Sequence, residues 1–325
     1  MSSYMQGRVK MTEKMIENVG IDIAKAKFDV AIHGENVVKT YHNNLSGMKK
    51  FLKSLNGKTP ERIVLEATGG YESKLVIYLQ KNGLQVCVIN PRVIRDFARM
   101  KNLRAKTDRL DALNIAHFAE LIKPPIQKPI TKNARLLKAL IARRRQLIEM
   151  RKAEKNHLEH ADDKFIRQSI NKIIKGLNKE IEQIDKEIDE LATQDKEVKR
   201  KIEILQSVPG IGQLSATIIA TNLPEIGECN RQQIAALLGV APMNRDSGTF
   251  KGKRMTGGGR KDLRTQLYMP ILSAIQYNPV IRNFYNRLVN NGKPKMTAVV
   301  ASMRKLFVIL NSMIKKNEEW SPQNA

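Results

Sequence analysis

The sequence predicts an α/β domain in its N-terminal third, a helical middle segment and a mainly α-helical C-terminal domain. Three observations predict this organisation. Short β-prone runs alternate with helical patterns as far as Leu121, the pair Pro124-Pro125 interrupts the pattern, and no strand signal follows over residues 134–205. The chain has 325 residues, which is enough for two compact domains and a connecting element.

The elements of the first domain follow from the spacing of apolar residues and from the Gly, Asn and Pro residues between them. We expect strands at residues 19–23, 28–32, 37–41, 62–66 and 85–89, and helices at 45–55, 72–82, 93–99 and 107–121. Strands that alternate with helices imply a sheet that is partly parallel. The predicted divisions of the chain are a flexible leader at 1–17, the α/β domain at 18–128, a helical segment at 129–205 and a C-terminal domain at 206–325.

The helical middle segment contains a heptad seam in which steps of three and four residues alternate. Its members are Ile174, Leu177, Ile181, Ile184, Ile188, Leu191, Val198, Ile202 and Leu205, and Asp195 stands in the single slot that breaks the run. A seam of this length predicts a coiled coil or a long antiparallel helix pair. It serves either as a spacer or as an arm through which copies of the chain form a homo-oligomer, a dimer or a tetramer.

The C-terminal domain opens with a short glycine turn. Gly210 and Gly212 lie in the run Val208-Pro209-Gly210-Ile211-Gly212, directly before an apolar helix. This arrangement is typical of a helix-hairpin-helix turn, in which backbone N–H groups at a helix N-terminus contact a phosphate. An ordinary turn between two helices is the alternative.

The charge of the chain indicates a polyanionic partner. Lys and Arg number 57 against 32 Asp and Glu, which gives a formal net charge of +25 and a pI of about 10.0. Nucleic acid is the usual polyanion for such a protein, although a basic proteome or a ribosome-associated role would give the same excess. Two cysteines and the lack of a signal segment or of a long apolar run favour the cytoplasm, with no membrane partner.

Four acidic residues stand where an α/β layer places ligand sites. Asp22 and Glu66 lie in or at the end of apolar strands, and Asp108 and Asp111 are three residues apart on one helix face. Carboxylates are the ligands that Mg²⁺ prefers, and paired ions assist phosphoryl displacement. Each acid alone also fits a turn or a solvated face. Their order along the chain, however, is that of the ribonuclease-H-like nuclease fold.

Four segments carry a family resemblance: GIDIAKAKFDVAI, VLEATGGYE, VINPRVIRDFA and LRAKTDRLDALNIA. They resemble the N-terminal domain of the DEDD transposase family, which is similar to the RuvC-like Holliday-junction resolvases and includes Piv-type DNA invertases and bridge-RNA-guided recombinases. The resemblance implies a RuvC-like domain in which Asp22, Glu66, Asp108 and Asp111 are catalytic and bind Mg²⁺. A basic run flanks the last two acids and is expected to face nucleic acid: Lys101, Arg104, Lys106 and Arg109.

A second candidate site lies in a glycine-rich basic stretch of the C-terminal domain. On its residues alone, Ser247 is a turn residue beside Gly248. The stretches LQSVPGIG and LLGVAPMNRDSGTFKGKRMTGGGRKDLRTQLYMP, however, resemble the C-terminal domain of the same family, which implies that Ser247 is a nucleophile that bonds covalently to DNA. Thr256-Gly257 departs from the Ser-Lys of many members. The cations expected to contact nucleic acid here are Arg245, Lys251, Lys253, Arg254, Arg260, Lys261 and Arg264.

The expected function is therefore that of a transposase or site-specific recombinase of an insertion sequence. It would cut and rejoin donor and target DNA through a phosphoserine intermediate, and the resemblance further implies a guide RNA as partner. Two alternatives stay open. One is a metal-dependent junction nuclease without a covalent serine step, and the other is a non-catalytic nucleic-acid-binding protein.

Overall fold

The computed structural model describes residues 18–102, 107–127, 129–244, 246–252 and 254–322. The chain divides into two compact units, which meet in sequence between Pro129 and Ile130. The leader predicted at 1–17 and the predicted contacts Arg104, Lys106, Arg245 and Lys253 lie outside the described residues.

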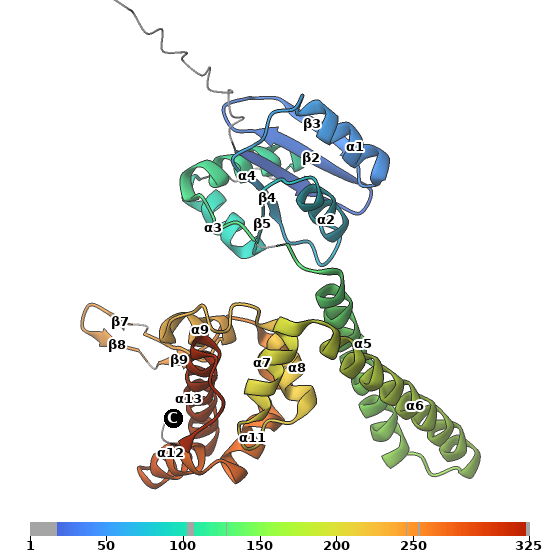
Figure 1. The fold of residues 1–325 in the computed structure, drawn as a ribbon, viewed down its shortest axis with the longest axis vertical. Helices are drawn as coiled ribbons and strands as arrows, with labels where there is room; N and C mark the ends of the chain where they lie inside the picture. The colour runs from blue at the N-terminus through green and yellow to red at the C-terminus, as the bar shows by residue number, and fades with distance from the viewer. Residues whose placement is uncertain (1–17, 103–106, 128, 245, 253, 323–325) are drawn as a thin grey trace, which may run out of the picture. The chain divides into compact units, whose positions relative to one another are not determined.

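Unit 1 is built on a five-stranded sheet in the order β3-β2-β1-β4-β5 (Figure 1). The strands are β1 (Val19–Ile23), β2 (Lys27–Ile32), β3 (Val38–His42), β4 (Ile63–Glu66) and β5 (Val86–Ile89). The first three strands are antiparallel, whereas β4 and β5 run parallel to β1. The predicted partly parallel sheet is confirmed, and each strand begins and ends within one residue of its expected position.

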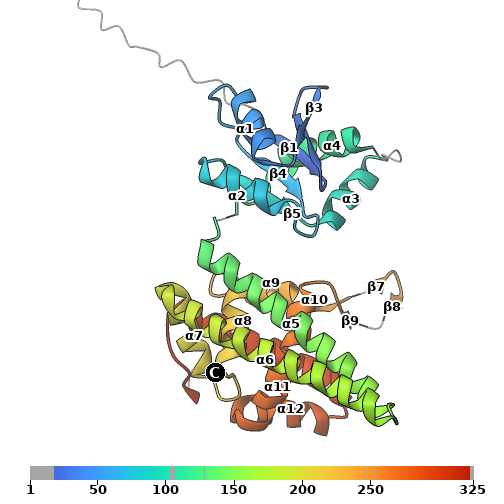
Figure 2. The ribbon, with the colours of Figure 1, turned by 90° about the vertical axis from the view of Figure 1, so that its right-hand side faces the viewer.

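Helices cover both faces of this sheet, as Figure 2 shows. They are α1 (Leu45–Ser54), α2 (Ser73–Lys81), α3 (Pro91–Met100) and α4 (Asp108–Ile122). Phe51 and Leu75, from α1 and α2, pack with Ile21 in one apolar cluster. Phe97 and Ile115, from α3 and α4, pack against the opposite face in a second cluster. Unit 1 is therefore a three-layer α/β domain.

Unit 2 begins with an antiparallel helix pair, α5 (Lys132–Glu159) and α6 (Lys164–Gln194), which projects from the rest of the unit in Figure 1. Leu147 packs with Leu177 and Ile181 along the seam. Beside this seam, the Arg144 Nη2 atom lies 3.2 Å from an Asp185 carboxylate oxygen. The seam predicted from the heptads thus forms a helix pair within one chain.

Asp195 ends this pair, and the seam does not continue as one helix beyond it. Its backbone is extended, and its side chain accepts hydrogen bonds from the amides of Glu197 and Val198 at the start of α7 (Lys196–Gln206). A short carboxylate that caps a helix N-terminus stabilises that end. The interruption of the heptads at this slot therefore marks a helix boundary.

The rest of unit 2 is a helical cluster around a large apolar core. Its helices are α8 (Gln213–Asn222), α9 (Arg231–Leu238), α10 (Lys261–Gln266), α11 (Tyr268–Tyr277), α12 (Pro279–Asn290) and α13 (Lys295–Lys316). By length and composition α13 would be able to cross a membrane, but half of its apolar window is buried inside the unit. Leu306 and Leu310 on this helix are fully or almost fully enclosed. We therefore assign α13 as the central helix of the core.

A β-ribbon leaves the cluster between α9 and α10 (Figure 1). It consists of β6 (Pro242–Met243), β7 (Asp246–Ser247), β8 (Phe250–Lys251) and β9 (Met255–Thr256), with β6 paired to β9 and β7 to β8. All eight strand residues are exposed. Without a buried face they show no hydrophobic alternation, which is why this stretch reads as a loop in the sequence.

Candidate active site

The close approach of α4 to β1 sets the position of the acidic residues. Gly20 on β1 faces α4 so closely that a Cβ atom there would lie 2.1 Å from the backbone nitrogen of Ala116. Residues two apart on a strand point to the same face. Asp22 therefore points to the α4 side of the sheet, near the N-terminal end of that helix.

Three carboxylates form a row across the sheet on this face. Asp22 is directly opposite Asp29 in the antiparallel β1–β2 register. On its other side, the parallel register pairs Ile21 with Leu65, so Glu66 follows beside Asp22 at the carboxyl end of β4. Neighbouring strands are about 4.8 Å apart. The row Asp29–Asp22–Glu66 thus gathers three acids at one edge of the sheet.

Asp108 and Asp111 lie in the first turn of α4, the helix that packs on the same face of the sheet as this row. The side chain of Thr107 caps this helix by accepting from the amide of Leu110. Acids are favourable at a helix N-terminus because of its partial positive charge. Lys27 links the helix to the sheet, with its Nζ atom 2.8 Å from Asp108 Oδ2 and 3.3 Å from Asp29 Oδ2.

The pKa of Asp22 reflects both its burial and the closeness of the other acids. Burial and the charges of four neighbouring carboxylates raise the pKa of Asp22 to about 6, and burial is the largest cause. In decreasing order of influence the neighbours are Asp111, Asp108, Glu66 and Asp29. All four predicted acids therefore lie in one electrostatic cluster, which we call the carboxylate cluster together with Asp29.

The donor chemistry of the cluster fits a hard divalent cation. Its side chains offer only carboxylate oxygens, and burial together with the charges of the neighbouring acids raises the pKa of Asp22; a bound cation would relieve the repulsion among these acids. Among the residues that the structure describes, however, no three His, Cys, Asp or Glu side chains stand together as a ready set of metal ligands. One acid, Asp108, is instead in an ion pair with Lys27. The cluster therefore offers the type of oxygen ligand that such a cation prefers, but the described side chains are not arranged as a set that could hold it.

Asp29 is the member of the cluster that sequence reasoning missed. It is buried, with 4% of its surface exposed, and its carboxylate accepts a hydrogen bond from Thr40. A buried carboxylate needs such partners because desolvation disfavours its charge. The signal in the sequence was an acid in the middle of the apolar strand Phe28-Asp29-Val30.

Two of the predicted basic contacts of unit 1 already have partners within the unit. Lys101 Nζ lies 3.2 Å from His117 Nδ1 and 5.6 Å from the centre of the Phe97 ring. Arg109 follows Asp108 on α4 and donates a hydrogen bond of 2.9 Å to the carbonyl of Asn36. Arg109 is exposed, so it is also reachable from solvent, whereas Lys101 is half-buried.

Ser247 is exposed at the tip of the ribbon, as the last residue of β7. It pairs with Phe250 across a two-residue turn that begins at Gly248, whose φ is +55°. Glycine adopts this left-handed conformation without steric cost, so the Ser-Gly sequence is suited to the turn. The turn presents the Ser247 hydroxyl to solvent, at a distance from the helical core along the ribbon.

The predicted cations around Ser247 fall into two groups. Lys251, Arg254 and Lys261 are exposed. Arg260 and Arg264, by contrast, fasten the root of the ribbon. Arg264 donates to the carbonyls of Leu238 and Gly258, at 2.8 and 3.0 Å.

A second set of hydrogen bonds, from Arg260, anchors the base of the ribbon. Arg260 donates to Asn222 O at 2.9 Å and to Glu225 Oε2 at 2.8 Å. Burial opposes the charge on Glu225, but the hydrogen bonds it accepts, above all from Arg260, lower its pKa overall. The guanidinium of Arg260 thus has a structural role within the fold.

The predicted glycine turn joins α7 to α8. Gly210 has φ +94°, and a Cβ atom there would lie 2.5 Å from the Ala274 Cα atom on α11. Gly212 is the N-cap residue of α8 and has no side chain to accept from the first amides of the helix. α7 and α8 are thus joined by a tight turn, in which Gly210 permits close packing against α11 and Gly212 leaves the first amides of α8 without a side-chain cap.

Comparison with known proteins gives matches along nearly the whole chain. Residues 19–164 match the DEDD family model of IS110, described as a transposase, and residues 202–286 match the transposase model of the IS116/IS110/IS902 family. The pilin gene-inverting protein of Moraxella bovis is 30% identical over 317 residues, which cover 92% of this chain and 96% of the relative. The chain belongs to the IS110/IS116/IS902 family of transposases.

Further relatives agree with this assignment. The pilin gene-inverting protein of Moraxella lacunata is also 30% identical, over the same share of both chains. An uncharacterised protein of the insertion element IS900 from Mycobacterium paratuberculosis is 31% identical over 127 residues, 38% of this chain and 32% of that relative. The IS110-family chain is thus a DNA-processing enzyme of the transposase and recombinase class.

Membership of the IS110 family also accounts for the architecture of unit 1. The DEDD transposase domain implies a ribonuclease-H-like fold, and the mixed five-stranded sheet agrees with it. The same family indicates a general dependence on divalent metal ions. The predicted family, enzyme class and N-terminal fold are therefore confirmed.

Proposed function

We propose that this chain is the transposase of an insertion sequence and that it uses two chemical groups, the carboxylate cluster and the Ser247 hydroxyl. The observation that carries the proposal is the gathering of five carboxylates, with Asp22, Asp29 and Glu66 in one row of the sheet and Asp108 and Asp111 in the first turn of α4. Burial and these neighbouring charges together raise the pKa of Asp22. Such crowding destabilises the metal-free chain and is retained where function requires it. The exposed position of Ser247 on the ribbon tip supports its role as the nucleophile.

In this proposal Asp22, Glu66, Asp108 and Asp111 hold Mg²⁺. When bound, a divalent ion supplies positive charge that stabilises the oxygens of a phosphoryl transfer. Lys27 carries the compensating charge beside Asp108 in the metal-free chain. Asp29 positions Lys27 and is not itself a ligand.

The Ser247 step exchanges one phosphoester for another. The Ser247 oxygen attacks a DNA phosphorus, an oxygen–phosphorus bond forms, and the bond from phosphorus to the departing strand breaks. The hydroxyl proton passes to a carboxylate of the cluster, and the leaving oxygen takes up a proton in turn. A hydroxyl of the new strand then displaces Ser247 by the reverse step. No outside oxidant or energy source is needed, because the number of phosphoester bonds is conserved.

Among the described ribbon residues no histidine is present, and the only acid is Asp246, the residue before Ser247 on β7. Successive residues of a strand point to opposite faces, so the Asp246 carboxylate is not directed at the Ser247 hydroxyl. A serine becomes a nucleophile only with a base or a metal to take its proton. We therefore infer that the carboxylate cluster of the same chain or of a second copy activates it. A homo-oligomer, a dimer or a tetramer, fits this requirement, with the α5–α6 pair as its arm.

Donor DNA, target DNA and a guide RNA are the proposed partners, in the cytoplasm. Pairing with a guide would leave the protein to hold backbones and not to read bases. The exposed cations Lys251, Arg254 and Lys261 suit this task, since they contact phosphate without sequence preference. RNA that co-purifies with the chain and pairs with DNA flanking the element would support the guide.

Strand cleavage and joining on labelled donor and target DNA test the proposal. We expect Asp22→Asn, Asp108→Asn and Ser247→Ala to lose joining by about 1,000-fold or more, as removal of catalytic groups does. Asp96→Asn and Thr249→Val are matched controls, because Asp96 is an exposed acid of unit 1 outside the carboxylate cluster and Thr249 is an exposed residue of the turn that follows Ser247. Full joining by Ser247→Ala would leave a junction nuclease that uses the acids alone. DNA binding without any cleavage would leave a non-catalytic binding protein.

A further inference from the structure

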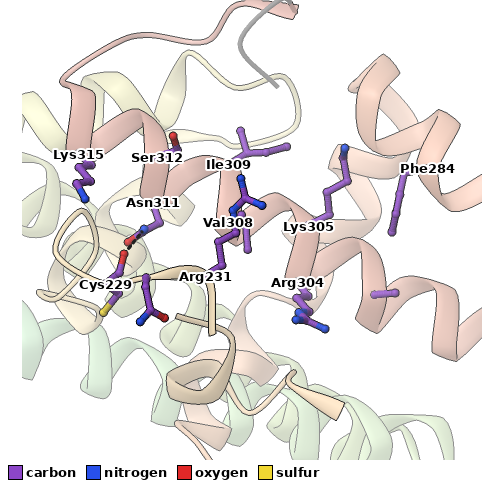
Figure 3. A pocket seen from close by; sticks show the side chains of 12 residues that line it. Cys229, Arg231, Phe284, Arg304, Lys305, Val308, Ile309, Asn311, Ser312 and Lys315 are labelled. Carbon is purple, nitrogen blue, oxygen red and sulfur yellow. Dashed lines mark hydrogen bonds between the residues drawn. The ribbon is translucent and has the colours of Figure 1, made fainter. Parts of the chain in front are cut away.

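A groove in unit 2 is lined by none of the candidate catalytic residues. It has a volume of about 700 Å³ and lies between the start of α9, α12 and α13 (Figure 3). An adjoining cavity of about 320 Å³ shares Phe284 and Lys305 with it. We call the two together the α13 groove.

The α13 groove is lined by cations without carboxylates. Arg231, Arg304, Lys305 and Lys315 line the larger cavity and Arg287 the smaller one, and neither lining contains Asp or Glu. Within the described part of the chain, none of these five side chains is in an ion pair with a carboxylate. Like charges held close together repel one another, so the groove favours an anionic occupant.

Arg231 is an informative member of this set. It is the first residue of α9, where the partial positive charge of the helix end makes a cation unfavourable. Asn230 already caps this end, because its side chain accepts from the amides of Gln232 and Gln233. Arg231 therefore does not stabilise the end of α9. An anion in the groove, by contrast, would be stabilised by the positive charge of Arg231.

Contacts within the chain fix the wall of the groove that contains Arg231. Asn311 on α13 accepts from the Gly227 amide at 2.9 Å. It also donates to the Cys229 carbonyl at 2.7 Å (Figure 3). Gly227 approaches α13 so closely that a Cβ atom would lie 2.6 Å from Ile314 Cγ2. These contacts hold the segment before Arg231 against α13, so the cations are presented from a fixed frame.

The floor of the groove is apolar and aromatic. Val308 and Ile309 contribute to it, and Phe284 stands between the two cavities. The Arg287 guanidinium carbon and Lys305 Nζ lie 5.3 and 5.5 Å from the centre of the Phe284 ring. A duplex turns its phosphates outward and keeps its bases inside. An aromatic ring among cations suits an unpaired strand, whose bases stack while its phosphates meet the charges.

We propose that the α13 groove binds a single strand of DNA, such as the strand that recombination exposes. The inference rests on the proposed function only in taking DNA as the substrate. Phosphates of the strand lie on Arg231, Arg304 and the lysines. A base stacks on Phe284 in place of the Arg287 or Lys305 side chain that lies over the ring in the free chain. The groove thereby holds a strand end without taking part in the phosphoryl transfer.

Fluorescence anisotropy of the full-length protein in EDTA tests this site, with oligothymidylate of about 20 nucleotides as the probe. Arg231 and Lys315 are both exposed, and we expect the double variant Arg231→Gln, Lys315→Gln to weaken binding about 10-fold. The slope of log affinity against log salt concentration should fall by about 1.4, because two phosphate contacts are lost. Lys172→Gln combined with Lys179→Gln, exposed on α6, removes the same charge elsewhere and is expected to change affinity by less than about 2-fold. Phe284→Leu should weaken binding about 5-fold or more through the loss of stacking, without changing the slope.

Equal losses in the groove variant and in its control would overturn the site. So would an equal loss on a blunt duplex, or a loss confined to an RNA strand of the same length. If Phe284→Leu binds like the wild type, the stacking step is wrong. Because no metal is present and nothing is cleaved, failure of this assay leaves the tests of Asp22 and Ser247 intact, and failure of those tests leaves this one intact.

Discussion

Gly20 on β1 and Ala116 on α4 are in such close contact that no side chain fits between them. The contact brings the first turn of α4, with Asp108 and Asp111, over Asp22. Even a methyl group at Gly20 would push the helix away, since it would lie 2.1 Å from the Ala116 nitrogen. A residue with no reactive group thus determines the geometry of the carboxylate cluster.

Gly20→Ala is therefore expected to lower the free energy of unfolding by about 1–3 kcal/mol and to reduce DNA joining. Gly176→Ala is the matched control, because Gly176 lies inside α6 with open space where an added methyl group would stand. There, alanine should stabilise the chain by about 0.5–1 kcal/mol. Thermal unfolding measures both. Equal effects of the two substitutions would contradict the role given to the Gly20 contact.

The pKa of Asp22 predicts how the stability of the metal-free chain depends on pH. Folding raises this pKa from 3.8 to about 6, so the folded chain holds the proton more tightly than the unfolded chain. The stabilisation is complete below pH 3.8 and is lost as the pH rises to about 6. Discounted for partial exposure, it amounts to about 1–2 kcal/mol.

Unfolding of the wild type and of Asp22→Asn in EDTA, compared between about pH 4 and pH 7, isolates this contribution from other titrating groups. The wild type should lose more stability than the variant over that range. Added Mg²⁺ should remove the difference, because a cation neutralises the repelling carboxylates. Parallel pH profiles of the two proteins would show that neither burial nor the neighbouring charges raise the pKa of Asp22.

Arg260 and Lys261 are neighbours in the sequence with different expected roles. Arg260→Gln breaks the contacts with Asn222 and Glu225, so we expect a loss of about 1 kcal/mol in stability. Lys261→Gln removes an exposed charge and should leave stability unchanged while it lowers the salt slope of duplex binding by about 0.9. Melting curves and salt titrations separate the two roles. Equal melting temperatures would contradict the fastening role of Arg260.

Mixing two inactive variants tests whether the acids and the serine of different copies cooperate. Asp22→Asn keeps Ser247, and Ser247→Ala keeps the carboxylate cluster. If the cluster of one copy activates the serine of another, the mixture should regain about a quarter to a half of the wild-type joining, as random assembly into dimers allows. No recovery, with both variants shown to form mixed oligomers, would mean that each copy uses its own serine.

The sequence was sufficient to predict the strands of unit 1 mainly because most of them have a buried apolar face, as in β1 and β4, although β3 has no buried residue. It also indicated four acids, because Asp22 and Glu66 lie in or at the ends of apolar strands and Asp108 and Asp111 share one helix face, in the order of the ribonuclease-H-like fold. It did not reveal Asp29, whose partner Thr40 comes from another strand. It could not separate Arg260 from Lys261 either, because ion pairs over 35 residues in sequence leave no local pattern.

The ribbon shows a second limit of sequence reasoning. Its strands have two residues each and no buried face, so neither length nor alternation distinguishes them from a loop. The role of Ser247 was predicted only from family resemblance. The acids of the carboxylate cluster other than Asp29, by contrast, could be predicted from residue chemistry and strand order.

The covalent intermediate is the measurement that tests the central claim most directly. A nicked DNA substrate that releases one product strand should trap the protein on DNA, and mass spectrometry of the protease-digested adduct should place the nucleotide on Ser247. We predict that the adduct forms with the wild type and Thr249→Val and is absent from Asp22→Asn and Ser247→Ala. An adduct of full yield with Ser247→Ala, or joining by the wild type without any adduct, would contradict the account.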